Sequence, residues 1–198
     1  DKGTIAAEML RQTVALTGAP ADMIVLGAGT GGTLTTFGRH ARHFGLDTRF
    51  CLADPQSSAF HRAIPESRAQ WREGCSSSVI EGIGRPKVEP SFFPRLVDRC
   101  EVVPDEESLA AMRWLSLVLG RTVGGSTGTG LAAALRIAHE GHKAGPLTIG
   151  LLICDPGARY ARTLHDDSWL EARGLSIAAA VARLEAELGV GTISARNA

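Results

Sequence analysis

The chain has 198 residues, of which 21 are lysine or arginine and 21 are aspartate or glutamate, so its formal net charge at neutral pH is zero. This balance argues against a general attraction to nucleic acid, and no apolar run is long enough to span a bilayer, so we expect neither nucleic acid nor a membrane as a partner. The length suits one domain with one sizeable core, and with no signal peptide in view we expect a cytoplasmic protein.

Predicted strands and helices alternate from the start of the chain. Thr4 is placed to cap a helix that runs to about residue 15, and the apolar run at residues 23–26 has the composition of a strand. A glycine-rich turn, a helix to about residue 44 and a strand at residues 49–53 follow. The stretch from residue 55 to residue 94 is irregular and rich in Gly, Pro and Ser, with one short helix expected around residues 66–72.

Regular structure resumes with a strand at residues 100–103 and a helix that begins with acidic residues and ends near Leu119. A further helix is expected after Gly128, ending near Gly141. Residues 147–153 form a continuous apolar run typical of a buried parallel strand, and residues 176–188 predict a last helix. This alternation predicts an α/β fold with a doubly wound, mostly parallel sheet and a ligand at the carboxyl ends of its strands.

The first glycine-rich turn, residues 27–33, has the pattern of a phosphate-binding site. It reads Gly-Ala-Gly-Thr-Gly-Gly-Thr and stands between a predicted strand and a predicted helix. Glycines let the backbone direct its N–H groups at an anion, and the start of a helix adds a partial positive charge. The candidate phosphate-binding residues are therefore Gly29, Thr30, Gly31, Gly32 and Thr33.

The same turn also satisfies the dinucleotide-binding pattern G-x-G-x-x-G, through Gly27, Gly29 and Gly32. Asp54 follows about 20 positions later at the end of a predicted strand, where such enzymes place an acidic residue on a ribose. This turn alone does not distinguish a nicotinamide cofactor from another phosphorylated cofactor.

A second glycine-rich turn, residues 124–130, opens another predicted helix. Two such turns suggest a ligand held at both ends, which suits pyridoxal 5′-phosphate, with its phosphate and its ring nitrogen. A serine at a helix start, here Ser126, can donate a hydrogen bond to an unprotonated pyridine nitrogen, and the positive helix end disfavours protonation there. A plain helix N-cap explains Ser126 equally well.

Four segments resemble the cysteine synthase and cystathionine β-synthase family of fold-type II pyridoxal-phosphate enzymes. Residues 29–33 resemble its phosphate cup, and residues 124–128 resemble its G-G-S-x-G segment, whose serine faces the pyridine nitrogen. Residues 80–84 match its E-G-I-G segment on the substrate side, and residues 154–160 resemble its closing turn. The resemblance implies pyridoxal phosphate as the cofactor, a fold like the tryptophan synthase β-subunit, and Gly82, Ile83 and Gly84 as substrate-side residues.

Residues 84–92, Gly-Arg-Pro-Lys-Val-Glu-Pro-Ser-Phe, resemble the stand-alone L-cysteine desulfhydrases of that family. This likeness implies β-elimination on L-cysteine, giving sulfide, pyruvate and ammonia. β-Replacement of the cysteine synthase or cystathionine β-synthase type is the alternative, and an NAD-dependent oxidoreductase or a non-enzymatic sensor is more distant. The substrate-side loop spans residues 80–92.

The family's Schiff-base lysine has no counterpart here, because Lys2, Lys87 and Lys143 do not stand at the matching place. In the family that lysine lies far upstream of the phosphate cup. We therefore expect residues 1–198 to be the C-terminal portion of a longer enzyme and to be inactive alone. The resemblance also implies a homodimer.

Cysteine and histidine spacing gives no further site. Cys51, Cys100 and Cys154 stand in or beside apolar strand-like runs and are expected to be reduced core thiols, with Cys75 the most exposed. Two histidine pairs on predicted helices lack a clear third ligand, so no metal site is predicted.

Overall fold

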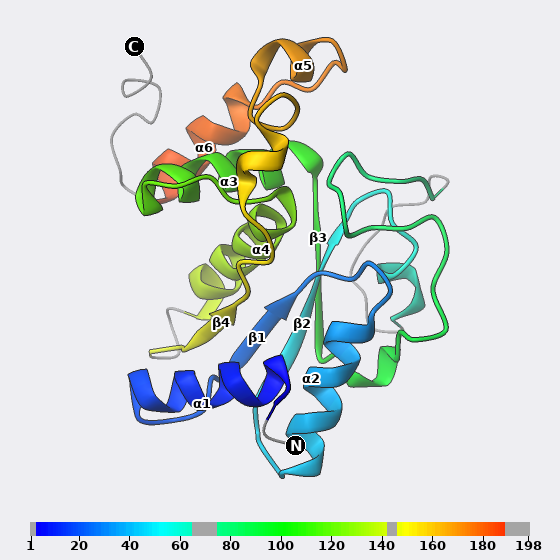
Figure 1. Ribbon diagram of the computed structural model, residues 1–198, viewed down its shortest axis with the longest axis vertical. Coiled ribbons are helices and arrows are strands. Elements are labelled where there is room, and N and C mark those ends of the chain that lie inside the picture. Colours follow the sequence, from blue (N-terminus) through cyan, green and yellow to red (C-terminus); the bar gives the residue numbers. More distant parts are fainter. Residues whose placement is uncertain (1–2, 65–74, 142–145, 189–198) are drawn as a thin grey trace.

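The computed structural model describes residues 3–64, 75–141 and 146–188 of the chain. The short helix predicted around residues 66–72 lies outside these ranges. Within them, strands and helices alternate along most of the chain, as the sequence predicts (Figure 1). No helix in the described part has the length and apolar character needed to cross a lipid bilayer.

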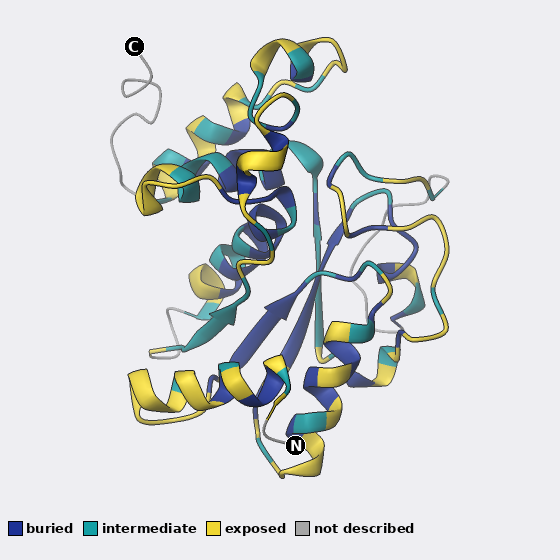
Figure 2. Ribbon diagram, in the orientation of Figure 1, coloured by how far each residue is buried: buried dark blue, intermediate teal, exposed yellow. Residues whose placement is uncertain are grey.

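Four parallel strands form a sheet in the order β3-β2-β1-β4. The strands are β1 (Met23–Leu26), β2 (Arg49–Pro55), β3 (Arg99–Val103) and β4 (Ile149–Leu151). The register places Val25 between Cys51 on β2 and Leu151 on β4. The inner strands β1 and β2 are almost entirely buried (Figure 2), as expected for a parallel sheet covered on both faces.

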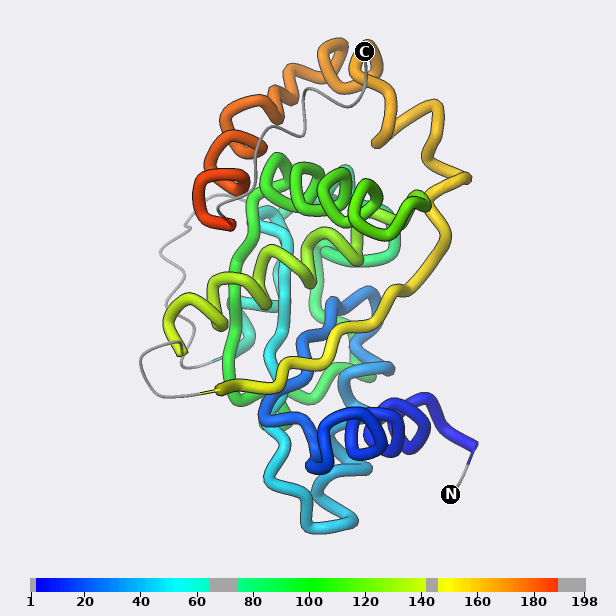
Figure 3. The backbone as a smooth tube through the Cα atoms, turned by 90° about the vertical axis from the view of Figure 1, so that its left-hand side faces the viewer, coloured from blue at the N-terminus to red at the C-terminus, as the bar shows by residue number. Residues whose placement is uncertain are grey.

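Helices lie on both sides of this sheet. One side carries α1 (Ile5–Thr17) and α2 (Gly32–His43). On the other side α4 (Gly125–Gly141) packs on the strands, α3 (Asp105–Leu119) packs against α4, and α6 (Ala178–Leu188) packs against α3. Successive strand side chains point to opposite faces, so Ile24 joins the core beneath α2 while Val25 joins the core beneath α4. Figure 3 shows α3 and α4 running side by side, with α6 next to α3. The doubly wound α/β fold is confirmed.

Short elements complete the described part: the 3-10 turns η1 (His61–Ala63), η2 (Pro94–Leu96) and η3 (Gly157–Tyr160), and the helix α5 (Asp167–Glu171). The helix α5 was not predicted from the sequence. The Asp166 side chain accepts a hydrogen bond from the Trp169 N–H and caps it.

Two further predicted elements differ from the structure. The strand expected over residues 147–153 is β4, which is shorter and half-buried, because it lies at the edge of the sheet. The helix expected after Gly128 begins at Gly125, so most of the second glycine-rich segment is helical. The first strand, residues 23–26, has the predicted bounds.

Candidate functional site

A cavity of about 380 Å³ lies where the two glycine-rich turns approach each other. It is bounded by the carboxyl end of β1, the start of α2, the loop at residues 81–83, the start of α4 and the segment from β4 to η3. The described residues that line it are Val25, Leu26, Gly27, Gly29, Thr33, Glu81, Gly82, Ile83, Ser126, Gly130, Leu151, Leu152, Cys154, Asp155, Arg159 and Tyr160. The fold thus brings together segments that are more than 100 positions apart.

At one end of the cavity, the phosphate turn leads into the N-terminus of α2. Gly31 is the N-cap residue, with a φ of 81°, and as a glycine it provides no side-chain cap; the Thr30 hydroxyl accepts a long hydrogen bond, 3.4 Å, from the Gly32 N–H. The first turn of α2 contains no acidic residue. N–H groups at a helix start have no partner within the helix, so this end offers free donors and a partial positive charge to an anion.

Close backbone packing explains the glycine at position 29. A Cβ atom on Gly29 would lie 2.2 Å from the carbonyl oxygen of Gly82. The same loop is tied to the phosphate turn by the Ser91 hydroxyl, which donates to the Thr30 carbonyl oxygen at 2.7 Å. The phosphate turn and the substrate-side loop therefore form one packed wall of the cavity.

The other predicted residues of these segments lie around the cavity without lining it. Thr30, exposed, accepts a 3.4 Å hydrogen bond from the Gly32 N–H, and Gly31 packs against Phe92. Gly84, with a φ of 69°, donates from its N–H to the Ala28 carbonyl oxygen at 3.0 Å. Of the predicted site residues, Gly29, Thr33, Gly82, Ile83 and Ser126 line the cavity.

The opposite end of the cavity is the start of α4, where Ser126 is the second helical residue. The segment after β4 holds this turn in place. The Gly124 N–H donates to the Asp155 carbonyl oxygen at 3.2 Å, and the Cys154 N–H donates to the Thr127 hydroxyl oxygen at 3.3 Å.

Burial and a nearby carboxylate keep two groups at this end uncharged. Burial, the hydrogen bond to Asp155 and the charge of Asp155 raise the pKa of Tyr160 to about 12. Desolvation of the thiol by the cavity walls also raises the pKa of Cys154, although the residue as a whole is exposed; a hydrogen bond with Ser126 lowers this pKa and the charge of Asp155 raises it. Both side chains are therefore neutral near pH 7.

An ion pair stands at the rim of the cavity. A guanidinium nitrogen of Arg159 lies 3.0 Å from a carboxylate oxygen of Glu81, and both side chains are largely exposed. Exposed pairs contribute little to stability. The pair nevertheless links the substrate-side loop to the closing turn.

Sequence reasoning missed the part played by the closing segment. Cys154 is exposed and lines the cavity, so the expectation of a core thiol is wrong for this residue. The apolar run before Cys154 suggested a long buried strand, but β4 ends at Leu151. Cys51 is buried as expected. Cys75 and Cys100 are both partly exposed, so the expectations that Cys75 would be the most exposed cysteine and that Cys100 would be a core thiol are also wrong.

Asp54 does not reach the cavity. It is 0% exposed, and its Oδ2 atom accepts hydrogen bonds from the backbone N–H of His61 at 2.9 Å and pairs with the His61 ring at 2.8 Å. A carboxylate buried in this way cannot accept a hydrogen bond from a bound ribose. The structure therefore removes the residue on which the nicotinamide alternative depended.

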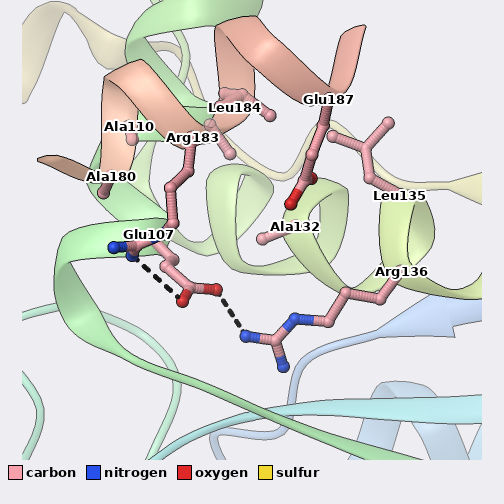
Figure 4. A pocket seen from close by; sticks show the side chains of 10 residues that line it. Glu107, Ala110, Ala132, Leu135, Arg136, Ala180, Arg183, Leu184 and Glu187 are labelled. Carbon is pink, nitrogen blue, oxygen red and sulfur yellow. Dashed lines mark hydrogen bonds and ion pairs between the residues drawn. The ribbon is translucent and has the colours of Figure 1, made fainter. Parts of the chain in front are cut away.

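A second, smaller cavity of about 130 Å³ lies between α3, α4 and α6 (Figure 4). Its floor is formed by alanine and leucine side chains, and at its edge Glu107 pairs with Arg136 of α4 and Arg183 of α6. None of the glycine-rich segments lines it. We assign it a structural role, in which Glu107 ties α6 to the rest of the domain. The described residues contain no cluster of three or more potential metal ligands.

Comparison with known proteins identifies the family. Residues 2–155 match the family model described as pyridoxal-phosphate dependent enzyme. The chain belongs to this family. Family membership confirms the predicted cofactor class and the fold-type II resemblance.

Among curated relatives, the chain is 49% identical over 164 residues to L-cysteine desulfhydrase Cds1 of Mycobacterium tuberculosis, covering 82% of this chain and 44% of that protein. It is 29% identical to cysteine synthase 2 of Schizosaccharomyces pombe, over 78% of this chain and 41% of that one. It is 31% identical to cystathionine beta-synthase of Apis mellifera, over 77% of this chain and 29% of that protein. The chain thus spans less than half the length of these relatives.

The described residues fit pyridoxal phosphate at its two ends. The start of α2 lacks a side-chain cap and offers N–H donors for a phosphate, while Ser126 offers a hydroxyl for the ring nitrogen. Lys87, the single lysine in the described ranges, is exposed and does not line the cavity. The described residues therefore provide non-covalent contacts for the cofactor, and none of them provides the lysine for a Schiff base.

Proposed function

We propose that the protein containing this chain degrades L-cysteine by pyridoxal-phosphate-dependent β-elimination, releasing sulfide, pyruvate and ammonia. The observation that carries the proposal is the cavity, which is lined at one end by the phosphate turn and at the other by Ser126. A ligand with a phosphate and a ring nitrogen matches these ends. Bound there, the cofactor supplies an electron-withdrawing ring for carbanion chemistry at the α-carbon of an amino acid.

Each wall of the cavity has a distinct part in this proposal. The N-terminus of α2 and the Thr33 hydroxyl bind the phosphate and fix the orientation of the ring. Ser126 donates to the ring nitrogen, and the N-terminus of α4 disfavours a proton there. Gly82 and Ile83 cover the substrate side and exclude water.

Elimination, rather than replacement, is supported by two observations. The desulfhydrase of Mycobacterium tuberculosis is 49% identical to this chain, whereas the named cysteine synthase and cystathionine beta-synthase are 29% and 31% identical. Residues 84–92 also resemble the matching segment of the stand-alone desulfhydrases. Transfer of a β-substituent to a second substrate is the alternative.

The test uses the full-length protein, loaded with pyridoxal phosphate and given L-cysteine without a second substrate. Sulfide and pyruvate are quantified together. Equal release of both supports elimination. Product formation only after addition of O-acetylserine and sulfide, or of homocysteine, would instead support replacement. If no absorbance band from bound cofactor appears, the proposal that the protein uses pyridoxal phosphate is wrong.

Dimerisation and location are further parts of this proposal. The family resemblance supports a homodimer, which sedimentation of the full-length protein tests. A cytoplasmic location is tested by cell fractionation.

A further inference from the structure

The Asp155 side chain lies at the end of the cavity where Ser126 stands. One of its carboxylate oxygens is hydrogen-bonded and the other is not. Its Oδ2 atom accepts a 2.6 Å hydrogen bond from the hydroxyl of Tyr160, a residue that is 4% exposed. Its Oδ1 atom is buried and finds no hydrogen-bond partner among the described residues. Buried carboxylate oxygens are seldom left without a partner, because their desolvation is costly.

The unpaired oxygen lies against the second glycine-rich turn. A Cβ atom on Gly124 would lie 1.9 Å from Oδ1 of Asp155. The Gly124 N–H also donates to the backbone carbonyl oxygen of Asp155 at 3.2 Å. Asp155 therefore contacts the turn through both its side chain and its backbone, and Gly124 is the residue that permits this approach.

The neighbouring residue makes a matching contact on the other side of Ser126. The Cys154 N–H donates to the Thr127 hydroxyl oxygen at 3.3 Å, while the Cys154 thiol donates to the Leu152 carbonyl oxygen at 3.8 Å. Ser126 thus lies between Gly124 and Thr127, both of which are held by the closing segment. The position of the Ser126 hydroxyl therefore depends on the position of residues 154–155.

We propose that Asp155, itself held by Tyr160, is a positioning residue that fixes the glycine turn and directs the Ser126 hydroxyl into the cavity. Asp155 acts through Ser126 and not as a catalytic residue. This inference rests on the proposed function, because the value of a fixed Ser126 lies in its contact with a bound pyridine ring.

A double-mutant cycle in the full-length protein tests the dependence on Ser126. The dissociation constant of pyridoxal phosphate and the emission spectrum of the bound cofactor are measured for Asp155→Asn, Tyr160→Phe, Ser126→Ala and the Asp155→Asn/Ser126→Ala double variant. Loss of a charge-assisted hydrogen bond predicts roughly tenfold weaker binding for Asp155→Asn. Because Asp155 acts through Ser126, the double variant should bind no more weakly than Ser126→Ala, and its spectrum should match that variant. Losses that add would overturn the positioning role.

A control separates this role from general destabilisation. Asp166→Ala removes the N-cap of α5, which follows the closing turn in the chain, and Asp166 makes no hydrogen bond with the glycine turn. It should lower stability and leave the cofactor spectrum unchanged. A spectrum altered in Asp166→Ala as in Asp155→Asn would mean that any loosening of this region suffices, and would also overturn the role.

A second measurement needs no cofactor. The rate at which iodoacetamide alkylates Cys154 is followed against pH, with buried Cys51 as the control thiol. Among the described residues, Asp155, Tyr160, Arg159 and Glu81 are the titratable or charged groups that line the cavity with Cys154. Removing the Asp155 charge should shift the alkylation profile to lower pH, and Tyr160→Phe should not.

The two measurements distinguish the possible failures. If the wild-type protein binds no pyridoxal phosphate, the proposed function fails, while the alkylation shift still reports whether Asp155 lies beside the thiol. An unshifted profile in Asp155→Asn would show that the Asp155 carboxylate does not face this end of the cavity, which would overturn the positioning role. Normal cofactor binding with additive losses would overturn the positioning role alone.

Discussion

At the scale of single residues, Gly29 is a position in the phosphate turn where backbone packing leaves no room for a side chain. Gly29→Ala would place a Cβ 2.2 Å from the Gly82 carbonyl oxygen, so the substrate-side loop must move. We expect the variant to lose about 1–3 kcal/mol of unfolding free energy and most of its affinity for pyridoxal phosphate. Denaturant unfolding and fluorescence titration measure the two quantities.

Gly32→Ala is the matched control for this substitution. In the same turn, an added Cβ would meet only the Thr30 hydroxyl, at 3.4 Å. The unfolding free energy of Gly32→Ala should stay within about 0.5 kcal/mol of wild type. Equal losses in the two variants would show that the Gly82 contact is not the reason for the glycine.

Ser126→Ala removes one hydroxyl at the opposite end of the cavity. The residue is half-buried, and alanine is well accepted in a helix, so the fold should be retained. We expect roughly tenfold weaker cofactor binding and slower turnover, because one hydrogen bond to the ring is lost. Wild-type turnover in this variant would contradict the role assigned to Ser126, and Ser126→Thr, which keeps a hydroxyl, should recover part of the loss.

The sequence predicted the two glycine-rich turns of the site better than it predicted the closing turn. Gly29, Thr33 and Ser126 were recognisable because glycine turns before helices have a known sequence pattern. Asp155 and Tyr160 were visible as part of the closing-turn resemblance, but nothing in the sequence says that a carboxylate would press on Gly124. That contact depends on a tertiary approach between residues about 30 positions apart.

At the scale of elements, α3 and α4 approach closely at Gly128. A Cβ on Gly128 would lie 2.1 Å from the Ser108 carbonyl oxygen and 2.8 Å from the backbone nitrogen of Met112. Neither neighbour can rotate away, so Gly128→Ala should separate the helices and cost about 1–3 kcal/mol of unfolding free energy. Thermal unfolding of the full-length protein measures the loss.

Gly130→Ala is the control on the same helix. Its new Cβ would meet the end of the Leu151 side chain at 2.5 Å, which can change rotamer. This variant should therefore be clearly more stable than Gly128→Ala. If Gly128→Ala were the more stable variant, the close approach of α3 and α4 would not be the reason for glycine at position 128.

His165 holds the turn that precedes α4, and its protonation should weaken the fold. Its Nε2 atom lies 3.1 Å from the Val123 carbonyl oxygen, and burial lowers the pKa of the ring below its ordinary 6.5, against the opposing effect of the Val123 hydrogen bond. The unfolded chain then binds the proton more tightly than the folded one. The stability gained from the neutral ring is thus present above pH 6.5 and is lost as the pH falls toward the lower folded pKa.

The comparison of wild type with His165→Gln tests this sign. The glutamine amide keeps a donor for Val123 but does not titrate. Between about pH 7 and about pH 5 the stability of wild type relative to His165→Gln should decline. A difference that stays constant over this range would show that His165 titrates alike in both states.

Element positions followed from the sequence where the local signal was strong. Thr4 caps α1 as predicted, and the acidic start of α3 complements its helix dipole. Local sequence misjudged β4, because an apolar run does not reveal whether its strand is central or at an edge. It also placed the start of α4 too late, because glycines disfavour a helix unless, like Gly128, they permit a close crossing.

At the scale of the whole molecule, the site exists because of the strand order. β1 lies between β2 and β4, so the turn after β1 meets the segment that follows β4 some 125 residues later. The sequence predicted a ligand at the carboxyl ends of the strands, which is a general property of doubly wound folds. It did not predict that residues 154–160 would complete the cavity.

The uncapped start of α2 makes folding and ligand binding one equilibrium. A phosphate placed there would act as the missing cap of the helix, so the amides of its first turn should exchange with solvent deuterium faster in the free protein than in the loaded one. If pyridoxal phosphate binds only the folded state, a concentration 100-fold above its dissociation constant should add about 2.7 kcal/mol to the unfolding free energy. Unchanged exchange at residues 33 and 34 on loading would show that the phosphate does not contact this helix. In a cell, the supply of the vitamin-derived cofactor would then help to set how long the protein survives proteolysis.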